Sequence, residues 1–175
     1  MNIFFLSLNP KICAMWHGDS HVIKMILEST QILFTCGHLL NPEWVQACPY
    51  TVYKKTHENH PSVIWARESY SNFFYLIRLG VELCLEKERR WVGNKPHACK
   101  KILLWMLQNP LPSENFERLD MTPVIPAMPI EFKEPREETI HDSMQLYREY
   151  YRYKYDTGIV KYSKIPDRKP EWIFD

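Results

Sequence analysis

The feature that most constrains the fold is the stretch from residue 19 to residue 38, which reads as one helix that is apolar around most of its circumference. At about 100° per residue, its polar side chains fall within an arc of roughly 100°. Apolar residues such as Ile26, Ile32 and Leu33 cover most of the remainder. A helix of this kind fits a mostly α-helical fold in which it packs on most of its sides. The polar line consists of His21, Lys24, Glu28, Gln31, Thr35 and His38.

The chemistry of this polar line differs from that of an ordinary solvated face, which is wide and rich in repeated Lys and Glu. The line is narrow, and it combines a base, an acid, an amide and two imidazoles. We expect it to face a partly desolvated cleft, where such groups suit proton transfer or the recognition of a polar ligand. The alternative is a helix that packs tightly on two sides and shows a thin strip to water.

The rest of the chain predicts one domain of 175 residues, in which 45% apolar residues supply a single core. A short N-terminal strand is expected at residues 3–8 and a loop on the cleft rim at residues 48–61. A Pro-rich extended strap is expected at 109–135, with Val124, Ile125 and Met128 over the helices, and a tail at 159–175 pinned by Trp172 and Phe174. Further helices are predicted at residues 10–16, 42–45, 61–90 with a break near Ser62, 96–107 and 137–157.

Charge and cysteine content limit the class of protein. The chain has 22 Lys and Arg against 21 Asp and Glu, which excludes a uniformly basic nucleic-acid coat but allows a local basic patch. Its five cysteines are odd in number and form no CxxC pair, which indicates reduced thiols in an intracellular, cytoplasmic protein. The apolar run at residues 3–8 is too short for a signal sequence or a membrane span, so no membrane partner is expected.

Lys24 and Glu28 are the first candidates for catalysis, because residues four apart on one helix face can touch. In a cleft, desolvation lowers the pKa of a lysine and yields the free amine that attacks an electrophilic carbon. A neighbouring carboxylate then moves the proton or stabilises a cation. A structural ion pair is an equally open interpretation.

Other candidates lie outside this helix. His60, Trp65 and Asn72 resemble a polar wall with a stacking ring, although a core histidine would give the same pattern. The chain lacks HExxH, paired Cys and His ligands and Asp-rich loops, so neither a metal nor another cofactor is expected. Cations interleaved with aromatic rings suit a nucleic-acid backbone with exposed bases, and a charged solvated face is the alternative. These residues are Arg89, Arg90, Tyr147, Tyr151 and Lys154.

Three segments together carry a resemblance to a known family. They are MNIFFLSLNP followed by DSHVIKMILESTQ, the central NHPSVIWARESYSN, and the later MPIEF, LYREYYRYK and KPEWI. They resemble small proteins of bacteriophages and large DNA viruses that are identified as pyrimidine dimer DNA glycosylases and related to phage endonuclease V. The resemblance spans nearly the whole chain. It implies a compact helical enzyme, in an infected host cell, that excises a damaged pyrimidine and nicks the strand with an amine nucleophile and a glutamate.

Applied to this sequence, the resemblance points to Lys24 and Glu28, with His21 beside them. The chemistry of the family uses the α-amine that is exposed when the initiator Met is removed. Here Asn2 is bulky for that removal and a buried N-terminal strand would hide the amine, so we expect Lys24 to be the substitute nucleophile. We expect a glycosylase on damaged DNA in which His21, Gln31 and His60 orient the sugar or base. Tyr147, Tyr151 and Trp65 would then stack on flipped bases.

Two other functions remain open at this stage. The polar line would equally form a pocket for a free nucleotide or a modified nucleobase, which the near-zero net charge favours. A non-catalytic viral protein could instead bind a host factor through its aromatic last helix and its tail. Neither the lesion nor the oligomeric state follows from the sequence.

Overall fold

A computed structural model describes residues 2–133 and 139–174 of the chain. These residues form seven α-helices and four short 3-10 helices, and their only β-pairing is one isolated bridge between Ser69 and Arg118. The predicted mostly α-helical fold is therefore confirmed. The α-helices are α1 (Pro10–Trp16), α2 (Asp19–Leu40), α3 (Pro42–Gln46), α4 (Pro61–Glu68), α5 (Tyr70–Arg90), α6 (Lys100–Gln108) and α7 (Ile140–Asp156). The 3-10 helices are η1 (Ser113–Asn115), η2 (Ile130–Phe132), η3 (Pro166–Arg168) and η4 (Glu171–Ile173).

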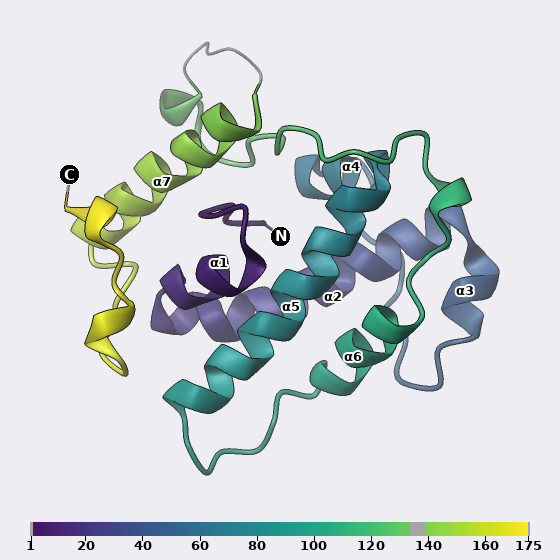
Figure 1. The fold of residues 1–175 in the computed structure, drawn as a ribbon, viewed down its shortest axis with the longest axis horizontal. Coiled ribbons are helices and arrows are strands. Elements are labelled where there is room, and N and C mark those ends of the chain that lie inside the picture. The colour runs from purple at the N-terminus through teal and green to yellow at the C-terminus, as the bar shows by residue number, and fades with distance from the viewer. Residues whose placement is uncertain (1, 134–138, 175) are drawn as a thin grey trace.

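The two longest helices form the centre of the molecule. The helix α5 crosses in front of α2, and α1, α4 and α6 pack against this pair (Figure 1). The helix α7 and the tail lie at one side, and the Pro-rich strap runs across to them from the region of α6 and η1 (Figure 1). The N-terminal segment ends in the middle of this arrangement, between α7 and the central pair (Figure 1).

The ends of the first helices follow from their sequences. Asn9 caps α1, since its side-chain oxygen accepts hydrogen bonds from the amides of Lys11 and Ile12, and Pro10 takes the first helical position. The helix α2 begins directly after Gly18, where a Cβ would lie 2.6 Å from the side chain of Val160. The tail therefore passes too close to this turn for any larger residue.

The predicted long helix at residues 61–90 is two helices, and the break is at Ser69 rather than near Ser62. The Ser69 side chain accepts from the amide of Asn72 and caps α5. The strap binds at the same point, because the amides of Tyr70 and Ser71 donate to the carbonyls of Arg118 and Leu119. A distant segment thus fixes the break. The helix α6 also starts later than expected, at Lys100 instead of Pro96.

The N-terminal segment is buried and extended, but it pairs with no strand in the part of the chain that the structure describes, so the predicted strand is wrong. Side chains satisfy its backbone instead. Arg148 Nε donates to the Leu6 carbonyl at 2.9 Å, and the Tyr75 hydroxyl donates to the Ser7 carbonyl at 2.6 Å. The thiol of Cys13 bonds to the carbonyl of Phe4.

The strap is extended as predicted, and Val124 and Met128 are buried beneath it while Ile125 packs against the core. Its last residues, 134 and 135, lie outside the described residues, as do residues 137 and 138 of the predicted last helix. The capping box of Thr139 and Asp142 starts α7 at Ile140.

The tail returns to the core through Trp172, whose ring packs edge-on against Trp16 at 5.7 Å, with the guanidinium of Arg148 over both rings. Phe174 contacts Tyr155 but stays 64% exposed, so the prediction that it pins the tail holds only in part. All five cysteines are free and buried.

Candidate active site

The polar line on α2 divides into two halves with different roles. In the second half, the Thr35 hydroxyl donates to the Thr56 carbonyl and accepts from the Thr56 amide. The Nε2 atom of His38 bonds to the carbonyl of Tyr53 at 3.0 Å. Both side chains therefore anchor the rim loop, and the predicted substrate-binding role of His38 is replaced by a structural one. Gln31 is half-buried between the two halves.

The first half contains a carboxylate in an unusual position. The amide N–H of Asn2 donates to Glu28 Oε2 at 2.7 Å, and Lys24 Nζ lies 3.5 Å from Glu28 Oε1. Only 12% of the Glu28 side chain is exposed, whereas 68% of the Lys24 side chain is exposed. The predicted contact between Lys24 and Glu28 is confirmed, but the lysine amine lies in solvent and not in the desolvated setting that the sequence suggested.

Asn2 is held at Glu28 by the strap and by α7. Its side-chain amide donates to the carbonyl of Ala127 at 2.9 Å. The hydroxyl of Tyr147 lies 3.4 Å from the side-chain oxygen of Asn2 and 3.3 Å from the carbonyl of Ile125, and its one hydrogen is within reach of both acceptors. The same hydroxyl accepts from the Ala127 amide. Three segments that are distant in the sequence therefore meet around the Glu28 carboxylate. The contacts of Asn2 with Glu28 and Ala127 could not be predicted from the sequence, because no local pattern marks a contact between residues 125 apart.

His21 lies on the same helix face, buried against the N-terminal segment. Its ring stacks on Phe4 at 4.6 Å, and its Nδ1 atom is 3.0 Å from the hydroxyl of Tyr151. Burial is the largest cause that lowers the pKa of His21 to about 3, and the nearby His17, Lys154 and Lys24 contribute to the same shift. Lys154 Nζ sits over the rings of Phe4 and Tyr150 at 5.7 and 4.7 Å. His21 is thus a neutral imidazole beside two ammonium groups.

Because the pKa values of His17 and His21 are lowered in the folded protein, we expect the protein to lose stability in acid. Burial lowers the pKa of His17 to about 4, and His21 shifts in the same direction, so both rings are neutral when folded and protonate more readily when unfolded. Protonation of the unfolded chain begins as the pH falls below about 6.5. The free energy of unfolding should therefore fall by roughly 2 kcal/mol per histidine between pH 7 and pH 5.

Urea denaturation at the two pH values measures this loss. In the variant His17→Gln, the fall in the free energy of unfolding between pH 7 and pH 5 should be about 2 kcal/mol smaller than in the wild type. His141→Gln changes an exposed histidine and should behave like the wild type. A drop of equal size in the wild type and in His17→Gln would contradict the assignment.

The rim contributes His60 at the start of α4. Its Nδ1 atom accepts from the amide of Ser62 at 3.2 Å and caps this helix. Burial lowers the pKa of His60, and the Glu28 carboxylate opposes this shift. The expected role of His60 in orienting a sugar or base stays a prediction.

Four aromatic and amide residues of the predicted site are structural instead. Trp65 and Asn72 are fully buried, and both bond to Thr122 of the strap. Tyr147 and Tyr151 are also fully buried, so their rings present no face to a base, and the stacking roles expected for them and for Trp65 are wrong. The rings of Tyr147 and Tyr151 instead pack against Phe4 of the N-terminal segment, and the ring of Trp65 packs against Phe5 and Tyr75.

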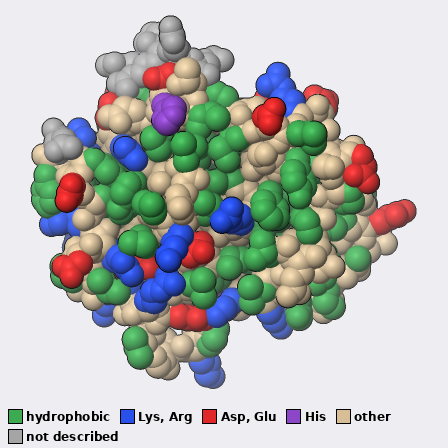
Figure 2. Space-filling model, viewed as in Figure 1, with side chains coloured by type: hydrophobic (Ala, Val, Ile, Leu, Met, Phe, Trp, Pro, Cys, Tyr) green, Lys and Arg blue, Asp and Glu red, His purple; other side chains and the backbone are tan. Residues whose placement is uncertain are grey.

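Arg89 and Arg90 belong to an ion cluster at the end of α5. The fully buried carboxylate of Glu86 accepts from Arg90 Nε at 2.9 Å and Arg168 Nε at 3.2 Å, and Arg89 Nη1 lies 3.5 Å away. Arg90 also pairs with Asp19. Figure 2 shows Lys and Arg side chains gathered near the C-terminal segment and this end of α5, with acidic side chains among them. The predicted nucleic-acid contact of Arg90 is therefore replaced by a buried ion pair, while Arg89 is partly exposed.

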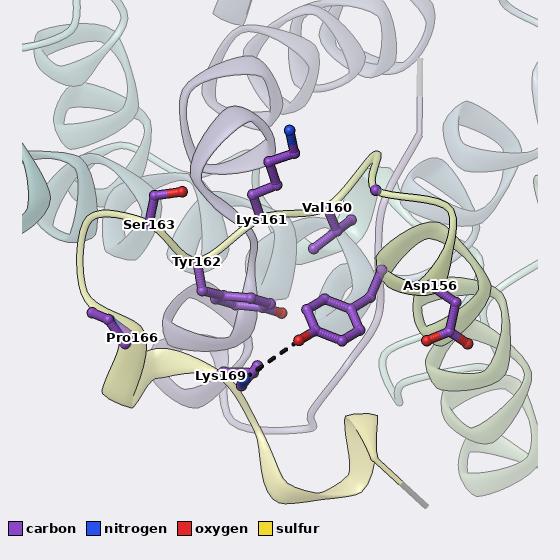
Figure 3. Close-up of a pocket in the computed structure, with 9 residues that line it drawn as sticks. Asp156, Val160, Lys161, Tyr162, Ser163, Pro166 and Lys169 are labelled. Carbon is purple, nitrogen blue, oxygen red and sulfur yellow. Dashed lines mark hydrogen bonds between the residues drawn. The ribbon is translucent and has the colours of Figure 1, made fainter.

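A separate hollow of about 530 Å³ lies where the tail passes the end of α7 (Figure 3). Lys169 Nζ donates to the hydroxyl of Tyr155 at 3.3 Å, as the dashed line in Figure 3 shows. The hydroxyl of Tyr162 donates to the carbonyl of Trp16. Both tyrosines thus serve to hold the tail, and none of the residues predicted from the sequence to form the active site lines this hollow.

Residues 2–133 and 139–174 contain no group of three or more His, Cys, Asp or Glu side chains placed to hold a metal ion. Over the same ranges, none of the helices has the length and apolar character needed to cross a membrane. Comparison of the chain with protein-family models, curated proteins and solved structures gives no match.

Proposed function

We propose that the protein is a DNA glycosylase that removes damaged pyrimidines through an amine nucleophile and Glu28. The observation that supports this proposal best is the position of the Glu28 carboxylate, which is largely shielded from solvent and lies 2.7 Å from the backbone nitrogen of Asn2 and 3.5 Å from Lys24 Nζ. A carboxylate within reach of two nitrogen positions can accept a proton from an attacking amine.

The chemistry assigns a role to each group. The unprotonated amine attacks C1′ of the damaged nucleotide, a nitrogen–carbon bond forms, and the glycosidic bond breaks with its electron pair leaving on the base. The departing base takes up a proton from water, and the attacking nitrogen gives one of its protons to Glu28. Glu28 then returns this proton to O4′ as the C1′–O4′ bond breaks, which opens the sugar ring and leaves a Schiff base between the nitrogen and C1′. Elimination of the 3′ phosphate from that Schiff base would nick the strand.

Two amines could act as the nucleophile. Lys24 is in contact with Glu28, but it is mostly exposed. If the initiator Met is removed in the cell, the α-amine of Asn2 would stand where its backbone nitrogen now contacts Glu28. The second position is the better shielded one, since Asn2 is half-buried and clamped by Ala127 and Tyr147.

Borohydride trapping on duplex DNA with a damaged pyrimidine tests the proposal. Reduction of the Schiff base should give a covalent protein–DNA adduct, and mass analysis of the digested adduct should place it on the N-terminal peptide or on the peptide that contains Lys24. Lys24→Arg keeps the charge but cannot form the adduct, so trapping is lost if Lys24 is the nucleophile and persists if Asn2 is. The absence of an adduct and of excision for every lesion tested would contradict the proposal.

An enzyme for free nucleotides is the second candidate. The net charge of +1 favours it, because a large duplex-binding surface usually carries more positive charge. Assays of free nucleotides beside damaged duplex DNA separate the two functions. The third possibility, a host-factor interaction through α7, has less support because Tyr147 and Tyr151 are buried.

A further inference from the structure

We propose that the hollow between the end of α7 and the tail binds one nucleotide, whose phosphate meets Lys169 and Tyr155 and whose base stacks on Phe174. The hollow has a volume of about 530 Å³, within the range of roughly 300–1,000 Å³ that is typical of small-molecule sites. Its lining residues all belong to the segment 155–169, which is separate from the residues around Glu28. The nucleotide site therefore does not depend on the glycosylase proposal.

The hollow is accessible from solvent. The lining residues Asp156, Lys161 and Ser163 are exposed, whereas Val160 and Tyr162 supply the buried part of the lining. A ligand can therefore reach the hollow from the surface of the protein.

Hydrogen bonds to the end of α1 and the start of α2 hold the tail side of the hollow in place. The Tyr162 hydroxyl donates to the carbonyl of Trp16 at 2.6 Å. The backbone N–H of Asp19 donates to the carbonyl of Lys161 at 2.8 Å, and the Asp19 carboxylate accepts from the backbone N–H of Ser163 at 2.7 Å. This side of the hollow is thus preformed, which lowers the entropic cost of binding a ligand.

Lys169 and Tyr155 together supply the hydrogen-bond donors for a phosphate. Lys169 Nζ donates to the Tyr155 hydroxyl at 3.3 Å, which leaves two hydrogens on the ammonium group and the hydroxyl's own hydrogen for a ligand (Figure 3). Within residues 2–133 and 139–174, none of the ion pairs includes Lys169. Its Nζ lies 4.3 Å from the ring centre of Phe174 and 5.5 Å from that of Tyr155, and both rings hold it in place. A phosphate oxygen at this position would accept charge-assisted hydrogen bonds.

Phe174 supplies a surface for the base. It is 64% exposed, and its ring meets that of Tyr155 edge-on, with the ring centres 6.2 Å apart. An exposed aromatic ring beside a cation suits a base that stacks while its phosphate meets the cation. Because only a sugar separates base and phosphate, one nucleotide can reach both Phe174 and Lys169, whose ring centre and Nζ are 4.3 Å apart.

Asp156 favours a nucleotide over a simple anion. Its carboxylate repels a phosphate, but it can accept hydrogen bonds from the N–H groups of a base. The Ser163 hydroxyl can donate to or accept from the sugar or the base. Two lysines and this one carboxylate line the hollow, so its charge is positive overall. This combination suits one phosphate joined to a neutral base with N–H donors.

Calorimetric titration of the full-length protein with thymidine monophosphate tests the inference. Thymidine and inorganic phosphate each lack one half of the nucleotide, so each should bind at least about tenfold more weakly. A short single-stranded oligonucleotide identifies the source of the nucleotide. Tighter binding than that of the monophosphate indicates a nucleotide within a strand, and weaker binding indicates a free nucleotide. Tighter binding of phosphotyrosine than of thymidine monophosphate would overturn the assignment.

Matched variants locate the site. Lys169→Gln should weaken binding of thymidine monophosphate about tenfold, as expected for the loss of a charge-assisted contact. Lys101 also sits over an aromatic ring, that of Tyr50 at 5.0 Å, so Lys101→Gln is the control and should change the affinity less than about twofold. Phe174→Ala should weaken nucleotide binding at least about fivefold, because stacking is lost, but should leave binding of inorganic phosphate within about twofold.

Three results would overturn the inference: equal effects of Lys169→Gln and Lys101→Gln, an unchanged nucleotide affinity in Phe174→Ala, or nucleotide binding that is lost in Glu28→Gln and kept in Lys169→Gln. Phe174→Ala changes an exposed side chain, so it tests the site even if Lys169→Gln fails to fold. Nucleotide binding in the hollow without any excision would contradict only the glycosylase. Excision by a protein that does not bind thymidine monophosphate would contradict only the nucleotide site.

Discussion

Replacement of Glu28 by Gln should lower the rate of base excision at least ~100-fold, the loss expected when a positioned acid–base group is removed. The amide has nearly the same shape as the carboxylate, and its oxygen can still accept the hydrogen bond from the Asn2 amide. It cannot take a proton from the attacking amine or stabilise a cation at C1′. Affinity for DNA should stay nearly constant. Single-turnover excision from a damaged duplex measures the rate of the chemical step directly.

The control for this variant is Glu43→Gln, which removes one negative charge from an exposed position on α3. Its excision rate should match that of the wild type. Unfolding by urea should show that Glu28→Gln remains folded. If excision by Glu28→Gln stays within about threefold of the wild-type rate, Glu28 has no catalytic role and the proposed mechanism fails.

Replacement of Arg90 by Met should lower the free energy of unfolding by about 3 kcal/mol, because it leaves buried acceptors without their charged partner. The Arg90 guanidinium is fully buried and bonds to Glu86, Asp19 and the carbonyl of Met15. These contacts join the end of α5 to α1 and to the start of α2. Arg168 remains as a partner of Glu86, which keeps the loss below that of a fully unpaired charge.

Arg89→Met is the matched control, because Arg89 is adjacent in sequence and contacts the same carboxylate. Its side chain is 40% exposed and lies 3.5 Å from Glu86, so the cost should be less than about 1 kcal/mol. Urea denaturation at pH 7 measures both variants. If both variants lose the same free energy of unfolding, the burial of Arg90 does not explain its contribution to stability.

The local sequence is sufficient to predict where α1 starts, but it is not sufficient to predict where α5 starts. Asn9 and Pro10 specify the start of α1 by themselves, since cap and proline act on the neighbouring backbone. Ser69 caps α5 through an equally local bond to the Asn72 amide, yet serine is too common for this position to stand out. The hydrogen bonds from the Tyr70 and Ser71 amides to residues 118 and 119 complete the break. A contact across nearly fifty residues leaves no periodic signal.

In the candidate site, too, the local sequence predicts some features and the tertiary contacts decide the others. Helical periodicity placed His21, Lys24 and Glu28 on one face, because their spacing depends only on the geometry of α2. It could not tell that Glu28 is shielded while Lys24 is exposed. Glu28 meets the backbone N–H of Asn2, which Ala127 helps to hold in place, and this contact exists only in the tertiary structure.

The sequence by itself thus determined the helical class, the extended strap and the face of α2 that carries the polar residues, since each follows from short-range geometry or from the backbone restrictions of proline. Only the tertiary structure decided which of these polar groups surround Glu28 and which anchor loops or fill the core. Contacts with the N-terminal segment, the strap and α7 decide how deeply each carboxylate or imidazole is buried. They also decide which hydrogen-bond donors it meets. The side chains at positions 21 and 38 are both histidines, yet packing makes one a neutral group beside two lysines and the other an anchor for the rim loop.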